Sequence, residues 1–451
     1  GLLAAAVYLY TPYHLLDLYV RSSLAEFSAL AALPWAFWAF TALAEEGGAR
    51  RTAWAALGFA VLLLTHNATA LMGTPLLAAW VLAQLLAEPC RRAALQRAGW
   101  ALGAAALGVG LAGFFIAPML AEQRFVQLGQ WTGGSYSFLK HFVYPSQLLS
   151  PFWGFGYAGE GTADAMSFQL GLAPLVGFAV VCIWGRRLHP GRSKALFLAL
   201  ATMTVVFFML PASAPLWQAL PLAALVQFPW RLLALTTLTL AALSGAAPRL
   251  LAGAGGAEAR ALLPAALLAV LLAGLPYAQA EHTPRDPRTE QAVAVIDFET
   301  FSPLDRVGMT VWVEEQPLDS PLVAQYLGNE PLTKARVLAG QGQVETIHYG
   351  GERVTARVQA DGPLTLQFLT YYFPGWHGWV DGQQTPLRPE GPQGLIALEV
   401  PSGDHQVEIR LGNTPARSAG LILSAGSGIM WLGLLAASRP RKGGGPIVAM
   451  P

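Results

Sequence analysis

The sequence has little charge: only 12% of its 451 residues are Asp, Glu, Lys or Arg, whereas 54% are hydrophobic. Soluble domains carry roughly 25% charged residues, and a soluble chain this apolar would expose patches large enough to aggregate. Burial in a lipid bilayer is the simpler explanation. The formal net charge is +1. Because nucleic-acid binding requires a basic excess, we expect no nucleic-acid partner.

Cysteine and the common catalytic motifs are also scarce. The two cysteines, Cys90 and Cys182, lie beside basic segments, so we expect no disulfide framework. The chain has no HExxH or CxxC metal spacing, no P-loop, no dinucleotide glycine fingerprint and no G-x-S-x-G motif. We therefore name no metal ligands and expect no catalysis of the soluble type. A divalent cation is the one cofactor left open.

What the chain does have is a series of long apolar runs. About 20 helical residues cross the roughly 30 Å of bilayer hydrocarbon. Nine runs approach that length, and we interpret a tenth, shorter run at the start of the sequence as a truncated helix. They cover residues 1–10, 24–44, 50–65, 69–87, 98–118, 167–185, 194–211, 230–247, 261–277 and 417–437. The sequence thus predicts an α-helical polytopic membrane protein with about ten transmembrane helices. We place a transmembrane domain at 1–277, a final span at 417–437 and a cytoplasmic tail at 438–451.

Basic residues gather in alternate connections between these runs. Examples are Arg50 and Arg51, the group from Arg91 to Arg97, and the group from Arg186 to Lys194. By the positive-inside rule, this side is cytoplasmic. The other side receives a long aromatic loop, about residues 119–166, which is typical of a functional loop or a lid. We expect short interfacial helices there, for example at 138–149.

Residues 281–416 have a different character. Charges appear and side chains alternate with a period of two, as in Val354-Thr355-Ala356-Arg357-Val358 and Val407–Leu411. Turn dipeptides, such as Asp361-Gly362 and Asp381-Gly382, separate these segments. This pattern predicts an extracytoplasmic antiparallel β-sandwich. The aromatic segment 371–382 could stack on sugar rings, but we favour packing within the sandwich or against the membrane loops.

Polar residues from distant segments are predicted to meet at the outer membrane boundary. Ionisable groups there are costly, so retained ones usually face a cavity or a partner. Arginine suits phosphate because its guanidinium donates two parallel hydrogen bonds. We predict lipid-phosphate or substrate binding by Arg21, His66, Asn67, Arg231, Tyr13 and His14. Asp17 and Glu26 are weak candidates for a base or a cation-orienting group. Lys140, His141 and Trp153 are candidates for acceptor binding on the long loop, where Glu122 and Arg124 also lie.

Each of these residues also has a structural explanation. Arg21 and Glu26 could form a simple ion pair, and His66-Asn67 could cap two helix ends. Arg231 could follow an aromatic anchor at a helix start. Lys140 and His141 could lie on a solvated loop face. The clustering at one depth, rather than any single residue, carries the prediction.

Two segments resemble a known family. Residues 10–27, with Leu64–Asn67 and the QFPWR segment at 227–231, resemble bacterial membrane proteins called 6-pyruvoyl-tetrahydropterin synthase-related. The segment FPGWHGWVDG at 373–382 is similar to the C-terminal domain of that family and of YfhO-like membrane proteins. These proteins look like members of the GT-C glycosyltransferase superfamily. This resemblance implies a polyprenyl-phosphate sugar donor and a reaction at the outer face of the membrane.

This resemblance implies a glycosyltransferase of the bacterial inner membrane. It would move a sugar from a polyprenyl-phosphate donor to an extracytoplasmic acceptor, with membrane lipids and the lipid-linked sugar as partners. The family's acidic catalytic motif would lie upstream of Gly1, since the chain begins within an apolar run, so the catalytic residue is unknown. The alternative is a non-catalytic scaffold or lipid-handling protein with a carbohydrate-binding-like exported domain. A transporter is less favoured, because it would place polar groups at the bilayer midplane.

Overall fold

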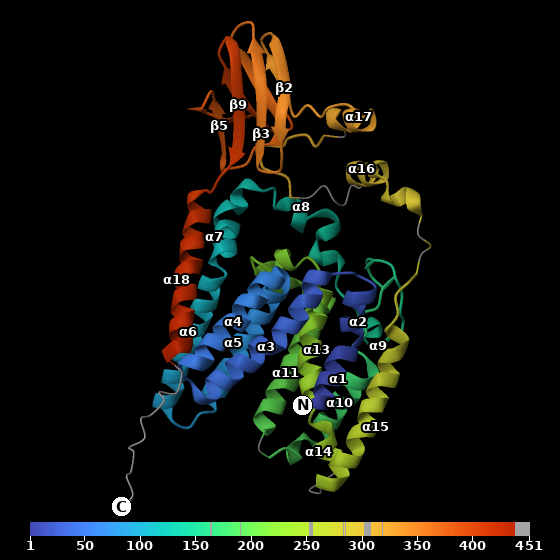
Figure 1. The fold of residues 1–451 in the computed structure, drawn as a ribbon. Coiled ribbons are helices and arrows are strands. Elements are labelled where there is room, and N and C mark those ends of the chain that lie inside the picture. The colour runs from blue at the N-terminus through green and yellow to red at the C-terminus, as the bar shows by residue number, and fades with distance from the viewer. Residues whose placement is uncertain are drawn as a thin grey trace, which may run out of the picture. The chain divides into compact units, whose positions relative to one another are not determined.

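The computed structural model describes residues 1–162, 165–189, 191–251, 256–282, 284, 286–301, 308–317 and 319–437. The predicted tail at 438–451 lies outside these residues. The chain divides into two compact units (Figure 1). We call Gly1–Gly113, Thr132–His282 and the chain from Ile422 onward the helical unit. Phe114–Trp131 and Thr283–Leu421 form the strand unit. Each is described separately below.

The helical unit contains the apolar runs predicted to be helical before residue 280, except that the run 98–118 continues beyond Gly113 into the strand unit. Its longer helices are α1 (Leu2–Tyr10), α2 (Pro12–Tyr19), α3 (Leu24–Glu46), α4 (Ala49–Thr65), α5 (Asn67–Leu86), α6 (Arg91–Leu111), α10 (Leu172–Trp184), α11 (Arg192–Met209), α13 (Leu233–Ser244) and α15 (Gly256–Gly274). Short helices α9 (Pro145–Leu149), α12 (Ala214–Ala219) and α14 (Ala247–Leu251) lie between them. Part of α18 (Pro415–Ala437) completes the unit.

Some of these helices have the length and the apolar composition of a membrane span. Within the described ranges, five helical segments are long and apolar enough to cross a membrane: 24–46, 67–86, 192–209, 229–251 and 415–437. A sixth is added if Arg91–Leu111 and Gly113–Phe125 count as one bent span. The helical membrane character is confirmed. The count of about ten crossings stays a prediction.

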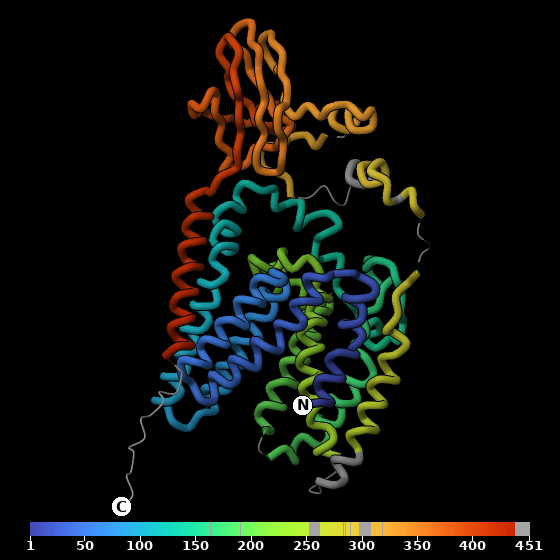
Figure 2. The backbone as a smooth tube through the Cα atoms, viewed as in Figure 1, coloured from blue at the N-terminus to red at the C-terminus, as the bar shows by residue number. Residues whose placement is uncertain are grey.

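Small residues allow the central helices to approach one another. Helix α3 packs on α4, and α4 on α6, as the traces in Figure 2 show. Gly58 of α4 faces the backbone of Ala36, and Gly108 of α6 lies against Ala56 and Phe59, where a side chain would collide. Such contacts are typical of membrane helices, since lipid supplies no hydrophobic driving force between them.

Two predicted helix boundaries were wrong, each for a local reason. The helix predicted at 98–118 begins at Arg91 and is interrupted at Ala112, because hydropathy excludes the basic first turns although they are helical. The helix predicted at 167–185 begins only at Leu172, after Gly171 with φ of 90°. The short helices expected around 138–149 are present as Phe138–Lys140 and Pro145–Leu149 rather than as one helix. Tyr144 is extended before Pro145, as residues preceding proline prefer to be.

The strand unit contains two antiparallel sheets. One has the order β1-β4-β8-β7 and the other β2-β3-β9-β5-β6. The strands are β1 (Ala335–Ala339), β2 (Gly342–Tyr349), β3 (Arg353–Ala360), β4 (Leu364–Tyr371), β5 (Trp376–Val380), β6 (Gln383–Thr385), β7 (Arg388–Glu390), β8 (Leu395–Val400) and β9 (Gly403–Leu411). Side chains from both sheets, including Phe368, Val358 and Ile409, form one buried core. The antiparallel two-sheet prediction is confirmed.

The strands occupy only the later part of the predicted β region. The described residues before Ala335 contain the helices α16 (Ala292–Phe301) and α17 (Pro321–Leu327) rather than strands. Alternation correctly predicted that Val354, Ala356 and Val358 are buried. The alternation is interrupted in β2, because a bulge after Thr346 shifts the register and leaves His348 exposed.

Candidate functional site

The corner between α2 and α3 assembles most of the predicted polar residues. Pro12 opens α2, as its fixed φ favours, and Asp17 and Arg21 lie one helical turn apart. Ser22, with φ of 50°, reverses the chain so that Glu26 enters in the first turn of α3. The apolar runs did not predict α2 as a helix. Pro12 followed by the Asp17/Arg21 spacing was the available signal.

Arg21 lies at the centre of this corner. Its guanidinium forms an ion pair with Asp17, donates to the Tyr13 hydroxyl at 3.2 Å and lies 2.9 Å from Glu26 Oε2. The Tyr13 hydroxyl also donates to Glu26 Oε1. Both carboxylates are fully buried, whereas the Arg21 side chain is 12% exposed. The predicted Arg21–Glu26 ion pair therefore exists, within a larger network.

Arg231 joins the network from a distant part of the chain. Its Nε lies 3.7 Å from Glu26 Oε2, and its Nη1 donates to the Val226 carbonyl and the Gln227 side chain, both at 3.0 Å. We call Tyr13, Asp17, Arg21, Glu26 and Arg231 the arginine cluster. Two arginines and two carboxylates give it a formal charge of zero. Buried charges are stable in such an arrangement only when each is paired.

Aromatic rings cover both guanidinium groups. Trp230 lies 4.6 Å from Arg21, and Phe228 lies 4.7 Å from Arg231, measured from guanidinium carbon to ring centroid. Guanidinium stacking of this kind adds cation–π attraction. Trp230 and Phe228 also stack on each other at 5.2 Å. From the sequence, Trp230 was expected only as an aromatic anchor. Its contact with a guanidinium group was not predicted, although Trp230 precedes Arg231 in the QFPWR segment.

The two predicted histidines have different environments. His14 is buried and packs edge-on against Tyr8 and Phe27 at 5.4 and 5.0 Å, so its ring belongs to the apolar core. His66 caps α5, since its Nδ1 lies 2.8 Å from Thr69 Oγ1 and 3.3 Å from the Thr69 amide. Burial lowers the pKa of His66, and the charges of Glu26, Arg231 and Arg21 also act on it. Asn67 is exposed in the first turn of α5.

The residues predicted to bind the acceptor are dispersed along the long loop. Lys140 is half-exposed and paired with Glu160 at 2.7 Å. His141 is buried, contacts the Ser135 carbonyl at 2.7 Å and packs on Phe228 at 4.6 Å. Trp153 packs on Tyr277 at 5.1 Å. Of these three residues, His141 is the one that lies next to the arginine cluster, because it packs on Phe228 and the Phe228 ring stacks on Arg231.

Glu122 and Arg124 belong to the strand unit. There Glu122 pairs with Arg417 at 2.9 Å and accepts from Thr414 at 2.5 Å. Arg124 lies 4.8 Å over the ring of Phe125. Both residues thus have partners of their own in that unit.

An apolar groove of about 710 Å³ ends beside the arginine cluster. Side chains of α5, α11 and the turns before α13 line it, among them Leu76, Phe208, Trp217 and Leu232. Val226 also lines the groove and accepts the hydrogen bond from Arg231. A hydrocarbon chain in the groove would therefore bring an attached polar group next to Arg231.

A second pocket, of about 360 Å³, is rich in hydroxyl groups. Its lining includes Ser146, Ser150, Thr162 and Ser167 of the long loop. Phe168 also lines it and packs against Trp230 at 5.7 Å. The pocket is thus linked to the arginine cluster through two aromatic rings.

The described residues offer few combinations of metal-binding side chains. Within them, no group of three or more His, Cys, Asp or Glu side chains lies close enough together to hold a metal ion. Asp17 and Glu26 are the only carboxylates of the arginine cluster, and the adjacent guanidinium groups neutralise both.

Comparison with known proteins gives one match. Residues 1–280 match the model of a family described as "6-pyruvoyl-tetrahydropterin synthase related domain; membrane protein". No curated protein and no solved structure matches the chain. The match covers more than half of the chain and includes every residue of the arginine cluster.

Proposed function

Because the chain belongs to the 6-pyruvoyl-tetrahydropterin synthase-related family of membrane proteins, we propose a function at the membrane boundary. The protein would be a GT-C-like glycosyltransferase that moves a sugar from a polyprenyl-phosphate donor to an extracytoplasmic acceptor. It would cross a bacterial inner membrane about ten times, with the strand unit outside the cytoplasm. One observation carries this proposal: Val226 lines the apolar groove, and its carbonyl accepts a hydrogen bond from Arg231 of the arginine cluster.

In this proposal the polyprenyl chain occupies the part of the groove next to Val226, and the phosphate lies between Arg231 and Arg21. An acceptor oxygen bonds to the anomeric carbon, the bond from that carbon to the phosphate oxygen breaks, and the phosphate leaves with the electron pair. Fixed cations stabilise the charge that develops on this leaving group. Glu26, bonded to Tyr13 and Arg21, would position the arginines. His66 and Asn67 would line the same region.

The acceptor side is assigned to the long loop. The hydroxyl-lined pocket suits a sugar or another polyol, since its serine and threonine hydroxyls both donate and accept. His141 and Trp153 would border this side, and Lys140 would lie at its exposed rim. A base must still accept the acceptor's proton. Among the described residues Asp17 Oδ2 lacks a hydrogen-bond partner, so Asp17 is the candidate within this chain.

A second candidate function is lipid handling without catalysis. It is favoured because Arg21 is already bonded to both Asp17 and Glu26, so the cluster could be a purely structural support for the groove. A lipid-binding protein needs the groove but no activated acceptor. The strand unit would then act as a binding module.

Turnover of a polyprenyl-phosphate sugar by the full-length protein tests the first candidate. Arg231→Gln is the informative variant, because Arg231 lies 3.7 Å from Glu26 and its loss leaves the Arg21–Glu26 contact in place. We expect kcat to fall about 100-fold, which is typical when one hydrogen-bond donor to the charge of the transition state is removed. Arg124→Gln, which removes an exposed arginine of the strand unit, is the matched control and should keep full turnover.

Two outcomes would decide against sugar transfer. Unchanged turnover in Arg231→Gln would remove this arginine from the site. Absence of turnover with every polyprenyl donor, combined with saturable binding of those donors, would favour lipid handling.

A further inference from the structure

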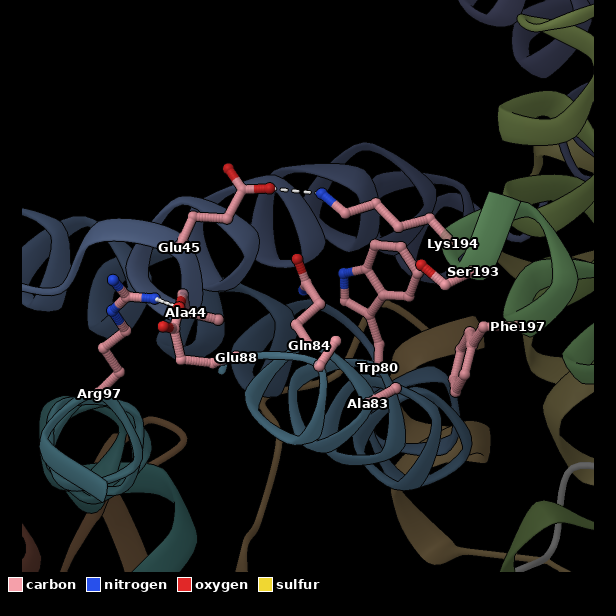
Figure 3. Close-up of a pocket in the computed structure, with 11 residues that line it drawn as sticks. Ala44, Glu45, Trp80, Ala83, Gln84, Glu88, Arg97, Ser193, Lys194 and Phe197 are labelled. Carbon is pink, nitrogen blue, oxygen red and sulfur yellow. Dashed lines mark hydrogen bonds and ion pairs between the residues drawn. The ribbon is translucent and has the colours of Figure 1, made fainter. Parts of the chain in front are cut away.

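A separate polar pocket lies at the opposite end of α3 from Glu26 of the arginine cluster. It occupies about 240 Å³ among the ends of α3, α5, α6 and the start of α11 (Figure 3). Glu26 and Glu45 mark the two ends of α3, which are about 30 Å apart at 1.5 Å per residue. The pocket is at the basic end of the bundle, beside the connections that carry Arg50, Arg51, Arg91 and Arg92.

Gln84 lies in the middle of this pocket. Figure 3 shows its amide between two ion pairs, and both its amide oxygen and its amide nitrogen are buried from solvent. Neither atom has a hydrogen-bond partner among the residues that the structure describes. Because burying an unpaired amide is costly, the group indicates a ligand that both donates and accepts hydrogen bonds.

The pocket presents both signs of charge. Lys194 Nζ lies 2.5 Å from Glu45, and Arg97 lies 2.6 Å from Glu88. All four side chains are partly exposed, so each can exchange its partner for a ligand group. Two cations and two carboxylates favour a ligand that is itself zwitterionic over one with a single charge.

Phe197 connects this pocket to hydrocarbon. Its side chain lines both the polar pocket and the apolar groove along α5 and α11, and its ring packs on Trp80 at 5.3 Å. A ligand bound here can therefore extend an acyl chain past Phe197 into the groove. At the end of a membrane bundle, a bilayer phospholipid has these properties.

We propose that the pocket binds the headgroup of a zwitterionic phospholipid with a primary amine. The phosphate contacts Lys194 and Arg97, the ammonium contacts Glu45 and Glu88, and Gln84 bonds the phosphate or the glycerol ester. The inner part of the groove, next to Phe197, holds an acyl chain. This site involves no residue of the arginine cluster, so it does not depend on sugar transfer.

Lipid binding by the purified full-length protein in detergent tests the proposal. The probes are phosphatidylethanolamine and phosphatidylglycerol with identical acyl chains, followed by native mass spectrometry and by the shift in Tm. We expect phosphatidylethanolamine to bind more tightly and to raise Tm more. Gln84→Leu should weaken its binding about fivefold, as expected for one lost hydrogen bond.

The control is Gln96→Leu, which removes an exposed amide of α6 at the same end of the bundle and should leave binding unchanged. Lys194→Gln provides a second variant if Gln84→Leu does not fold, and it too should weaken phosphatidylethanolamine binding. Equal binding of the two lipids would overturn the zwitterionic assignment. If Gln84→Leu raised the Tm and left both lipid binding and the lipid-induced Tm shift unchanged, Gln84 would contact only water. That result would overturn the proposal.

Discussion

Glu26 is the residue on which the arginine cluster depends. One oxygen accepts from Tyr13, and the other lies 2.9 Å from Arg21 and 3.7 Å from Arg231. Glu26 is thus the only member of the cluster that contacts both arginines and the tyrosine. Its full burial means that no solvent screens these interactions.

Glu26→Gln is expected to destabilise the helical unit strongly. The amide keeps the shape of the side chain but leaves two buried guanidinium groups with one carboxylate between them. Removing one partner of a buried ion pair typically costs about 3–5 kcal/mol. The measurement is the Tm of the purified protein in detergent, compared with wild type.

Glu46→Gln is the matched control for this change. Glu46 lies at the other end of α3 and pairs with Arg51, but the side chains are 62% and 41% exposed. Exposed pairs contribute about 0.2–1 kcal/mol, so the control should melt close to wild type. If both variants melted alike, the cluster would not be a buried network.

The sequence predicted the members of the cluster better than their contacts. Arg21, Glu26 and Arg231 were expected at one site because each begins or precedes an apolar run. The link from Glu26 to Tyr13 depends on the reversal at Ser22, which hydropathy cannot detect. The contacts of His14 were not predictable for a similar reason: on a helix, the residue after Tyr13 points elsewhere, here toward Phe27. Its role in binding stays a prediction.

The turn between β5 and β6 shows how one element of the strand unit is fixed. Asp381 and Gly382 both have positive φ, 47° and 79°, which is typical of a type I′ hairpin. The Asp381 carboxylate accepts from the Gln406 amide at 2.8 Å and contacts His405 Nδ1 at 2.6 Å. The turn is thereby attached to β9.

This pair predicts a pH dependence for the strand unit. The His405 hydrogen bond lowers the pKa of Asp381 below 3.8, and the Asp381 hydrogen bond raises the pKa of His405 above 6.5. The carboxylate's contribution is lost as pH falls through its lowered pKa, and the imidazolium's as pH rises through its raised pKa. The stabilisation is therefore complete between about pH 4 and 6.5.

NMR titration of the histidine rings in the full-length protein checks this prediction. His405→Gln assigns the signal by its disappearance. Asp381→Asn should return the pKa of His405 toward 6.5, because the charged acceptor is lost. An unchanged titration in Asp381→Asn would contradict the pairing.

Element types were predictable, whereas several element ends were not. All ten apolar runs contain helix, and the turn dipeptide Asp381-Gly382 was correctly placed between strands. The start of α6 at Arg91 was missed because helices continue into basic turns that no apolar window includes. The bulge after Thr346 was missed because alternation assumes a constant register.

At the scale of the whole molecule, the helical unit has a polar site near each end of α3, and an apolar groove lies between the two sites. The arginine cluster lies at the first turns of α3 and near the start of α5, and the Gln84 pocket lies where these two helices end. The apolar groove along α5 and α11 lies between these two sites. Phe197 lines both the groove and the Gln84 pocket, and Val226, which also lines the groove, is hydrogen-bonded to Arg231 of the cluster. Under the two proposals, one unit would bind lipid near both membrane boundaries.

The orientation of the helical unit is the last prediction. Cys90 is exposed in the basic connection between α5 and α6, which the positive-inside rule places in the cytoplasm. In bacterial cells expressing a Cys182→Ser protein, a membrane-impermeant maleimide should label Cys90 only after the membrane is permeabilised.

Gly351, in the exposed turn between β2 and β3, provides the opposite test. In a protein without either natural cysteine, Gly351→Cys should be labelled in intact cells. Labelling of Cys90 in intact cells, with Gly351→Cys protected, would reverse the topology and would place the arginine cluster on the cytoplasmic side, where an extracytoplasmic acceptor could not reach it.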